Sequence, residues 1–458
     1  MDVPYSQFWM EYYGFENAVS GNTGDSNEQT LALLENNDVI LQARFTYNDC
    51  RTKIPVLVKL ENGFKAIYPH LSAYPKENVA LVMKINREIA SHCGISIIEN
   101  EIVYLNKDYI REESLDVHKL LSSSDRLFNK RNNLGKTIEE YMEAIDFDLD
   151  ENIELTKQVL SSPSPEMPRT KLCTASRRCT YYDVCFDDSQ LPDNSILFLT
   201  TSRNKIDAYH QGIETISQMD PEKFEGFHLQ YAQYRASEQD YFVDSLAIKE
   251  WISRIQYPIS YLDFEWDTFA IPPYPKMKPF DVLCFQYSLH IEQEDGTLEH
   301  RDFFDVQDCR EAFILSILEN VPENGTVLVY NMEGAEKLRL MQLAEQFPQY
   351  ASQLKQICDR MVDLSKPFEL GKYYHNKMRG HYSLKSVLPV FTEEYSYSDL
   401  SVKDGLKAVR AYREFATSSQ EEQEIIREDI REYCKMDTFA EYIVYHGLEN
   451  LIKENKNA

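Results

Sequence analysis

The stretch Tyr261-Leu-Asp-Phe-Glu265 sets two carboxylates two residues apart inside an otherwise apolar run. In a β-strand, side chains alternate between the two faces, so Asp263 and Glu265 point to the same side. Acidic residues are poor strand formers, and neighbouring carboxylates repel each other unless a positive charge lies between them. The pattern therefore predicts a strand that presents a divalent-cation site.

Size and charge limit the classes of protein that fit this chain. Its 458 residues exceed what one hydrophobic core usually supports, so two or three domains are expected. A net charge of −27 argues against coating nucleic acid by bulk electrostatics, although a local basic groove or a carboxylate-bound metal can still bind it. We see no signal sequence and no apolar run of membrane-spanning length. We expect a cytoplasmic protein without membrane contact, whose acidic surface can also bind a protein partner.

Residues 1–172 are predicted to form an α/β domain. The expected elements are strands at 39–45, 54–60, 64–68 and 95–104, and helices at 76–94 and from Thr137 onward. Asn62-Gly63 between two alternating apolar runs indicates a hairpin. A breaker-rich segment, residues 161–168, marks the end of this part.

Residues 173–187 hold a cysteine cluster, and residues 188–257 are predicted to be a helical connector. Five residues separate Cys173 from Cys179, and five separate Cys179 from Cys185. Three thiolates completed by a histidine or by an aspartate can hold Zn²⁺, and the alternative is three reduced thiols in a packed knot. The other cysteines are scattered singly, which in a reducing compartment indicates buried thiols.

Residues 258–458 have the clearest pattern of the chain. The expected elements are strands at 259–265, 282–291, 298–304, 326–330 and 361–364, and helices at 309–320, 333–347 and 420–453. This order predicts a mixed sheet with helices on its faces, which is the ribonuclease-H-like order. Asp363 at a strand end is expected to cap the turn that follows.

Further carboxylates are expected to join the pair on the first strand. Tyr433 and Asp437 are four residues apart on one face of the last helix, and Glu333 or Glu336 follows the fourth strand. Such a set suits two Mg²⁺ or Mn²⁺ ions, since hard cations take oxygen ligands. Two ions roughly 3.5–4 Å apart can activate a water and stabilise the leaving oxygen in phosphodiester cleavage. Tyr433 would orient that water.

The segment 372–385 interleaves basic and aromatic residues. Its basic candidates for contact with nucleic acid are Lys377, Arg379, His381 and Lys385. Aromatic rings beside cations suit stacking of unpaired bases next to phosphate contacts, as in proteins that bind single-stranded nucleic acid. The alternative is an ordinary exposed loop before a helix.

Through its carboxylates and Tyr433, the chain resembles the DEDD (DnaQ-like) superfamily of 3′→5′ exonucleases, in its subtype with a Tyr-x-x-x-Asp third motif. More closely, it resembles the bacterial family catalogued as domain of unknown function 2779. The resemblance runs through Tyr261–Glu265, Ala270-Ile-Pro272, Phe285–His290, Val329-Tyr-Asn331, Ser383–Pro389 and Tyr433–Thr438.

The resemblance implies a metal-dependent 3′→5′ exonuclease that acts on single-stranded DNA or RNA ends. It implies first-motif roles for Asp263 and Glu265 and third-motif roles for Tyr433 and Asp437, all metal ligands except the tyrosine. Glu336, rather than Glu333, is our expected second-motif acid and metal ligand. The chain departs from the superfamily in having Trp266 after the first motif, where Thr or Ser is usual, and Glu in place of the usual second-motif Asp.

The N-terminal half resembles RecB-like PD-(D/E)XK nucleases, whose C-terminal cysteines hold an iron–sulfur cluster. Thiolate ligation of such a cluster needs four cysteines, and Cys50 is the only nearby candidate for the fourth. A working core would also need an Asp and a Glu-x-Lys where the chain has Val56-Leu-Val58 and Ala66–Pro69. The resemblance therefore implies a degenerate nuclease fold that cannot cut.

The leading expectation is the exonuclease. Its rival is a catalytically inactive nuclease-fold scaffold that binds nucleic acid or a protein partner, and the acidic charge and the degenerate N-terminal half favour that rival. A small-nucleotide phosphodiesterase would share the exonuclease site and differ in substrate length.

Overall fold

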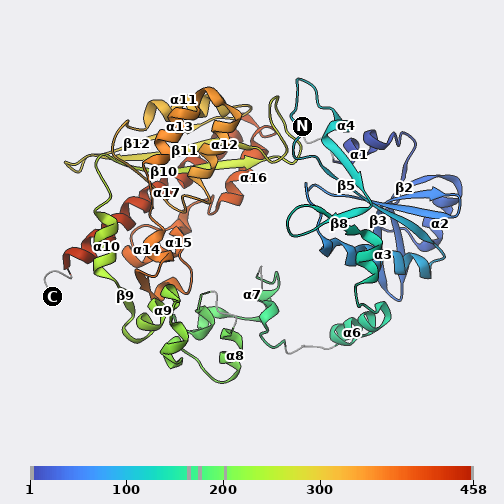
Figure 1. The fold of residues 1–458 in the computed structure, drawn as a ribbon, viewed down its shortest axis with the longest axis horizontal. Helices are drawn as coiled ribbons and strands as arrows, with labels where there is room; N and C mark the ends of the chain where they lie inside the picture. The colour runs from blue at the N-terminus through green and yellow to red at the C-terminus, as the bar shows by residue number, and fades with distance from the viewer. Residues whose placement is uncertain (1–4, 162–166, 174–177, 201–203, 455–458) are drawn as a thin grey trace. The chain divides into compact units, whose positions relative to one another are not determined.

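The computed structural model describes residues 5–161, 167–173, 178–200 and 204–454 (Figure 1). The chain divides into two compact units, of which unit 1 comprises Met1–Glu166 and Thr268–Asp281 and unit 2 comprises Met167–Asp267 and Val282–Ala458. Each unit is built on a mixed sheet flanked by helices, so the chain is an α/β protein. No helix within the described part of the chain has the length and apolar character that crossing a bilayer requires.

Unit 1 contains a six-stranded sheet. Its strands, in spatial order, are β1 (Val19–Ser20), β2 (Val39–Tyr47), β3 (Cys50–Leu60), β4 (Gly63–Pro69), β5 (Ile97–Leu105) and β6 (Leu121–Ser124). The pairs β1/β2 and β4/β5 are parallel and the others are antiparallel. The expected hairpin at Asn62-Gly63 is confirmed, and Gly63 is required there because a Cβ would lie 2.8 Å from the Ser96 carbonyl oxygen.

The two faces of this sheet carry separate apolar clusters, as strand alternation requires. Leu57 and its neighbours pack with α3 (Ala80–His92), whereas Val56 packs with Trp9 of α1 (Tyr5–Tyr13). The other named helices of the unit are α2 (Asn27–Asn36), α4 (Val117–Leu120), α5 (Ile138–Glu143) and α6 (Leu149–Ser161), and a small ribbon is formed by β7 (Arg126–Phe128) and β8 (Leu134–Thr137). The helix expected from Thr137 is thus two helices. Of the breaker-rich segment, residues 162–166 lie outside the described residues.

The loop between the first two strands of the C-terminal sheet, Thr268–Asp281, belongs to unit 1. Arg111 accepts a backbone hydrogen bond from Lys276 and donates one to Met277, and Ile271 packs into an apolar cluster of unit 1. This loop lies inside the 258–458 range of the sequence-based division.

Unit 2 begins with short helical elements. Its named α-helices before the main sheet are α7 (Tyr182–Cys185), α8 (Lys205–His210), α9 (His228–Gln239) and α10 (Ser245–Ile252). The segment 188–257 is mostly helical, as expected, but it also contains β9 (Tyr241–Val243), which pairs with β15 (Tyr373–His375) and was not predicted.

The main sheet of unit 2 has five strands. In spatial order they are β12 (Leu298–Phe304), β11 (Val282–Glu292), β10 (Ile259–Thr268), β13 (Thr326–Val329) and β14 (Met361–Asp363). β10, β13 and β14 are parallel neighbours, and β11 and β12 form the expected antiparallel hairpin.

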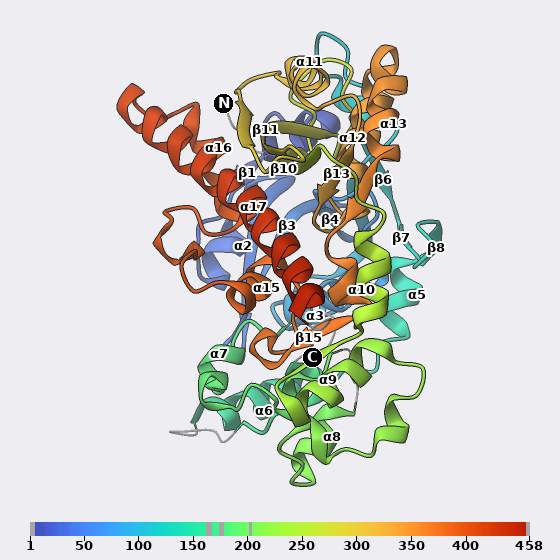
Figure 2. The same ribbon diagram turned by 90° about the vertical axis from the view of Figure 1, so that its left-hand side faces the viewer.

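Helices cover both faces of this sheet. One face packs on α11 (Arg310–Asn320), α12 (Glu336–Gln346) and α13 (Ala351–Asp359), and the other on α15 (Leu384–Phe391) and the long α17 (Gln420–Glu454), drawn in red in Figure 2. Leu262 and Phe264 face the first layer, whereas Tyr261 faces the second. The sequence did not predict α13, α14 (Lys366–Glu369), α15 or α16 (Gly405–Phe415).

Candidate metal centre

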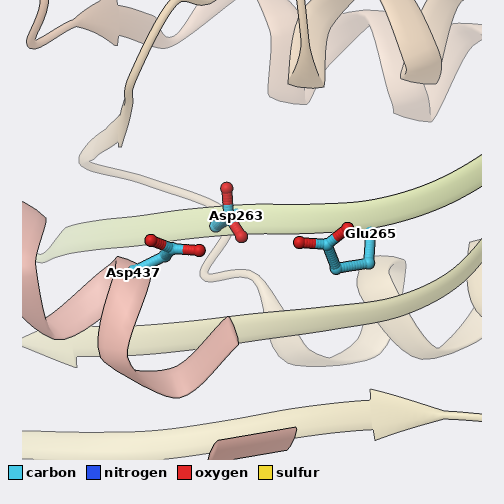
Figure 3. Close-up of side chains that lie close together, drawn as sticks. All are labelled: Asp263, Glu265 and Asp437. Atoms are coloured by element: carbon cyan, nitrogen blue, oxygen red, sulfur yellow. The ribbon is translucent and has the colours of Figure 1, made fainter. Parts of the chain in front are cut away.

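Three carboxylates converge between β10 and α17. Asp263, Glu265 and Asp437 each offer an oxygen atom, and these atoms lie within 4.8 Å of one another (Figure 3). Strand alternation turns both β10 acids toward α17, on the side opposite Leu262 and Phe264. Within the described part of the chain, no other set of three His, Cys, Asp or Glu side chains comes together this closely.

These carboxylates are buried close together, and this perturbs their ionisation. Burial raises the pKa of Asp263 well above its usual value, and the charge of Asp437 adds to the shift. Burial and then the charge of Asp263 raise the pKa of Glu265, and burial raises the pKa of Asp437 to about 6. In the metal-free protein the three groups therefore resist simultaneous ionisation, and a cation among them would offset their repulsion.

Hydrogen bonds hold two of these carboxylates in place. The Tyr397 hydroxyl donates to Asp437 Oδ1 at 2.6 Å, and the Cys434 thiol donates to Asp263 Oδ2 at 3.3 Å. Tyr397 was missed at the sequence level, because it lies in an irregular segment that shares no periodicity with α17.

Lys385 is a cation beside the three acids. Its Nζ donates to the Tyr433 hydroxyl at 3.0 Å and to the Lys403 carbonyl oxygen at 2.7 Å, and it lies 4.8 Å from the centre of the Tyr433 ring. Its charge lowers the pKa values of Asp263, Glu265 and Asp437, partly opposing burial. The sequence predicted Lys385 as a nucleic-acid contact, and the structure places it at the edge of the carboxylates.

Tyr433 lies one helical turn before Asp437 and is only 4% exposed. Burial, followed by the charge of Asp437, raises its pKa, so the phenol stays protonated. Its oxygen accepts the Lys385 hydrogen bond, and its hydroxyl also interacts with the Asp437 carboxylate one turn further along α17.

Glu336 and Glu333 have different surroundings. Glu336 is the first residue of α12 and is 1% exposed, and its Oε2 is buried without a hydrogen-bond partner among the described residues. Burial, and then the charge of Asp263, raises its pKa well above the usual value. Glu333 is exposed and forms an ion pair with Lys337 at 2.7 Å. Glu336 is thus the acid that faces the cluster, although it is outside the closest three.

Glu441 is a fifth acid, which the sequence did not single out. It follows Asp437 by one turn of α17, is 1% exposed, and also has a buried Oε2 without a partner among the described residues. After burial, the charges of Asp263 and Glu336 contribute most to raising its pKa. The i, i+4 spacing from Asp437 on a buried helical face was the available signal.

Asp363, by contrast, is fully engaged by its own chain. Its carboxylate accepts backbone N–H bonds from Asn331 at 3.0 Å, Met332 at 3.1 Å and Ser365 at 2.9 Å. The predicted capping role is confirmed, and the same carboxylate fixes the loop between β13 and α12.

The four basic residues predicted to contact nucleic acid are divided between two cavities of unit 2. Lys377 and Lys385 line one of about 450 Å³, and Arg379 and His381 line one of about 930 Å³. Arg379 is already bound, since its Nε lies 2.6 Å from Asp193 Oδ1. The structure therefore does not bring the four together as one surface.

Of the three clustered cysteines, Cys173 and Cys179 contact each other through their backbone. The Cys179 N–H donates to the Cys173 carbonyl oxygen at 2.9 Å, and the thiols of Cys179 and Cys185 are exposed. Residues 174–177 lie outside the described residues. Of the scattered cysteines, Cys284, Cys309, Cys358 and Cys434 are buried as expected, whereas Cys50 and Cys93 are partly exposed.

Comparisons with known proteins find a family match for one segment of the chain, which covers nearly all of the main sheet of unit 2 and the Thr268–Asp281 loop of unit 1. Residues 260–383 match the family described as "Domain of unknown function (DUF2779)". The "Uncharacterized protein UU173" of Ureaplasma parvum serovar 3 is 28% identical over 222 residues, which cover 43% of this chain and 32% of that protein. This chain thus matches about a third of the length of that relative. The search of solved structures gave no match.

The family match includes Asp263, Glu265 and Glu336 but ends before Tyr433 and Asp437. Neither description names an activity.

Proposed function

We propose that this chain is a metal-dependent 3′→5′ exonuclease that hydrolyses phosphodiester bonds at the ends of single-stranded DNA or RNA. The observation that carries the proposal is the convergence of oxygen atoms from Asp263, Glu265 and Asp437 within 4.8 Å. Divalent Mg²⁺ and Mn²⁺ prefer such hard oxygen ligands. The sheet order β12-β11-β10-β13-β14, with α17 across one face, supports a ribonuclease-H-like fold of the DEDD type.

The residues present fit two such cations. Asp263, Glu265 and Asp437 would hold the first, and the buried unpartnered oxygens of Glu336 and Glu441 would contribute to the second. An uncompensated buried carboxylate is unfavourable, and a bound cation would relieve that cost. When bound, such ions supply an activated water and stabilise the negative charge that develops on the phosphate.

Side chains of the protein would position the attacking water and the phosphate. The protonated Tyr433 hydroxyl accepts from Lys385 and interacts with Asp437, so it is held beside the acids, where it would orient an attacking water. The Lys385 ammonium can also stabilise negative charge on a phosphate held at the acids. Tyr397 fixes one oxygen of Asp437 by donating a hydrogen bond to it.

Unit 1 supports a different role. Its element order α2-β2-β3-β4-α3-β5 favours a PD-(D/E)XK-like fold, but Val56, Leu57, Ala66 and Ile67 fill the centres of the strands with fully buried apolar side chains. Unit 1 would therefore be a non-catalytic scaffold. If both units are scaffolds, the whole chain would bind nucleic acid or a protein partner without cleaving.

The cysteine cluster keeps two alternatives, an iron–sulfur cluster or Zn²⁺ at Cys173, Cys179 and Cys185. Elemental analysis and the visible absorption spectrum of the anaerobically purified protein distinguish them. Iron with broad absorbance supports the first, and stoichiometric zinc supports the second. If the folded protein contains neither iron nor zinc, both alternatives are contradicted.

Degradation of 5′-labelled single-stranded DNA and RNA with Mg²⁺ or Mn²⁺ tests the exonuclease. The wild-type protein should give a metal-dependent ladder, and Asp263→Asn and Asp437→Asn should abolish it. Asp295→Asn, an exposed acid in the β11–β12 turn, is the matched control and should cut normally. Intact oligonucleotide with folded wild-type protein would contradict the proposal, and cleavage confined to dinucleotides would favour a small-nucleotide phosphodiesterase.

A further inference from the structure

The 930 Å³ cavity of unit 2, here called the Lys205 cavity, is formed by parts of the chain that are distant in sequence. Residues between 178 and 205 supply one wall, and residues 379–384 supply another. Tyr330 and Asn331, at the end of β13, complete it. The cavity therefore lies where a parallel strand of the main sheet ends, a position at which α/β proteins commonly bind ligands.

Most charges around the Lys205 cavity are neutralised by protein partners. Asp188 pairs with Arg169 at 2.6 Å, and Arg178 pairs with Asp183. Glu369 likewise pairs with Lys366, and Arg379 with Asp193. These pairs leave the cavity wall close to neutral, with one exception.

Lys205 is that exception. Its Nζ donates to the Leu199 carbonyl oxygen at 3.2 Å and forms no ion pair with a described residue. Its side chain is half-buried, and burial lowers its pKa while the charge of Asp188, itself paired with an arginine, partly opposes that shift. The charges of Lys205 and Arg178 also lower the pKa of His381, so all three groups face the same space. A half-buried cation that lines a cavity of this size has room for an anionic partner.

The Lys205 cavity is adjacent to the acids. Leu328 of β13 pairs with Tyr261 of β10, so Tyr330 and Asp263 follow two residues further along neighbouring parallel strands. On the opposite wall, Leu384 lines the cavity, and the next residue, Lys385, contacts Tyr433. A strand that ends at the acids can therefore continue into this cavity.

We propose that the Lys205 cavity binds a backbone phosphate of the single-stranded nucleic acid, on the 5′ side of the bond that is cut, with Lys205 as its cationic contact. This inference rests on the proposed function, because it assigns a subsite to the same substrate. Tyr382 also lines the cavity and offers a ring on which a base can stack. His381, which the sequence predicted as a nucleic-acid contact, would then belong to this subsite. Arg379 is instead bound to Asp193 and forms part of the cavity wall.

Binding of a fluorescent single-stranded 12-mer to the full chain in EDTA tests the subsite without cleavage. Anisotropy titrations at several salt concentrations compare the wild-type protein with Lys205→Ala, Lys205→Arg and Lys223→Ala. Lys223 is an exposed lysine of the same segment that does not line the cavity, so it is the matched control.

Lys205→Ala should weaken binding about 10-fold, as expected for one charged hydrogen bond. It should also make the slope of log K against log salt shallower by about 0.7, the value for one phosphate contact on a single strand. Lys205→Arg should restore both quantities, and Lys223→Ala should change neither.

The subsite and the exonuclease can fail separately. Unchanged affinity and salt slope in a folded Lys205→Ala that cleaves normally would overturn the subsite and leave the exonuclease in place. A shallower slope with a wild-type protein that binds but never cuts would support the subsite and contradict the exonuclease. No binding of the 12-mer by the wild-type protein would overturn the subsite.

Discussion

The two sheets of this chain bury different kinds of polar side chain. In unit 1, the buried polar residues that the structure describes are Thr30, Thr52, Asn86 and Asn100, all neutral. In unit 2 they include seven acids: Glu265, Asp267, Glu292, Glu336, Asp363, Asp437 and Glu441. Burying a charge is costly unless a partner compensates it, so the acids of unit 2 need an explanation that unit 1 does not.

The seven acids divide into two kinds. Asp267 is paired with Arg413 at 2.7 Å, Glu292 with His446 at 3.0 Å, and Asp363 with backbone N–H groups. Glu265, Glu336, Asp437 and Glu441 have no ion pair with any described residue, and all four lie around Asp263. The first three acids are compensated within the fold, whereas the other four are the ones that the proposed metal site would compensate.

A matched pair of substitutions should give the largest difference in stability. Glu292→Gln should lower the free energy of unfolding by about 2–3 kcal/mol, because it removes the charged partner of His446, whose pKa is raised to about 9. Glu441→Gln should leave the stability of the metal-free protein unchanged or higher, because the buried Oε2 of Glu441 has no partner among the described residues and burial disfavours its charge. Urea denaturation in EDTA measures both, and a greater loss with Glu441→Gln would contradict this division of the acids.

Substitutions of Glu333, before α12, and of Glu336, its first residue, should separate the two second-motif candidates. Glu336→Gln should lower the cleavage rate by about 10–100-fold, as loss of a group that supports a metal site does. Glu333→Gln should cleave normally, since Glu333 is exposed and paired with Lys337. Initial rates on a single-stranded oligonucleotide decide between them, and equal rates for the two variants would remove Glu336 from the site.

The pH dependence of stability should report the crowding of the acids. Burial raises the pKa of Asp437 to about 6 in the folded protein, against about 3.9 in an unfolded chain. Its contribution to stability is therefore fully present below about pH 4 and is lost as the pH rises through about 6, a change on the order of 3 kcal/mol. Thermal unfolding in EDTA from pH 4 to 7 should show this loss.

Asp437→Asn serves as the control for that titration, because an amide does not ionise. This variant should make the decline between pH 4 and 6 shallower, whereas the other acids with raised pKa values keep their share of it. In the wild-type protein, Mg²⁺ should raise the unfolding temperature more at pH 7 than at pH 5, since the cation competes with protons. A wild-type profile that matches that of Asp437→Asn would contradict the assigned pKa shift.

The smallest effect is expected in unit 1. Glu101 is half-buried, pairs with Lys65 at 2.5 Å and accepts a hydrogen bond from Tyr13. Glu101→Gln should lower stability by about 1 kcal/mol or less and leave cleavage unchanged, because unit 1 is not expected to cut. A loss of cleavage with intact folding would make unit 1 part of the catalytic machinery.

Local periodicity allowed much of this site to be predicted from the sequence. Alternation in β10 predicted that Asp263 and Glu265 share one face of the strand, and helical spacing predicted that Tyr433 and Asp437 share one face of α17. The structure has both arrangements. Both predictions depend only on residues that are close in sequence, so they can be made without knowledge of the fold.

What the sequence could not supply depends on packing between distant segments. Glu441 is significant only because α17 brings its buried face against Asp263, and Tyr397 only because its irregular segment reaches Asp437. Arg379 shows the reverse: its place in a basic, aromatic segment predicted contact with nucleic acid, but Asp193 of the connector binds it. The insertion of Thr268–Asp281 into unit 1 was equally invisible.

The most direct test of the metal centre is calorimetric titration of the metal-free protein with Mn²⁺. The wild-type protein and Asp295→Asn should bind Mn²⁺, and Asp263→Asn should lose that binding while remaining folded. Folded wild-type protein that binds no Mn²⁺, or binding that Asp263→Asn leaves intact, would contradict the assignment of these acids to a metal site.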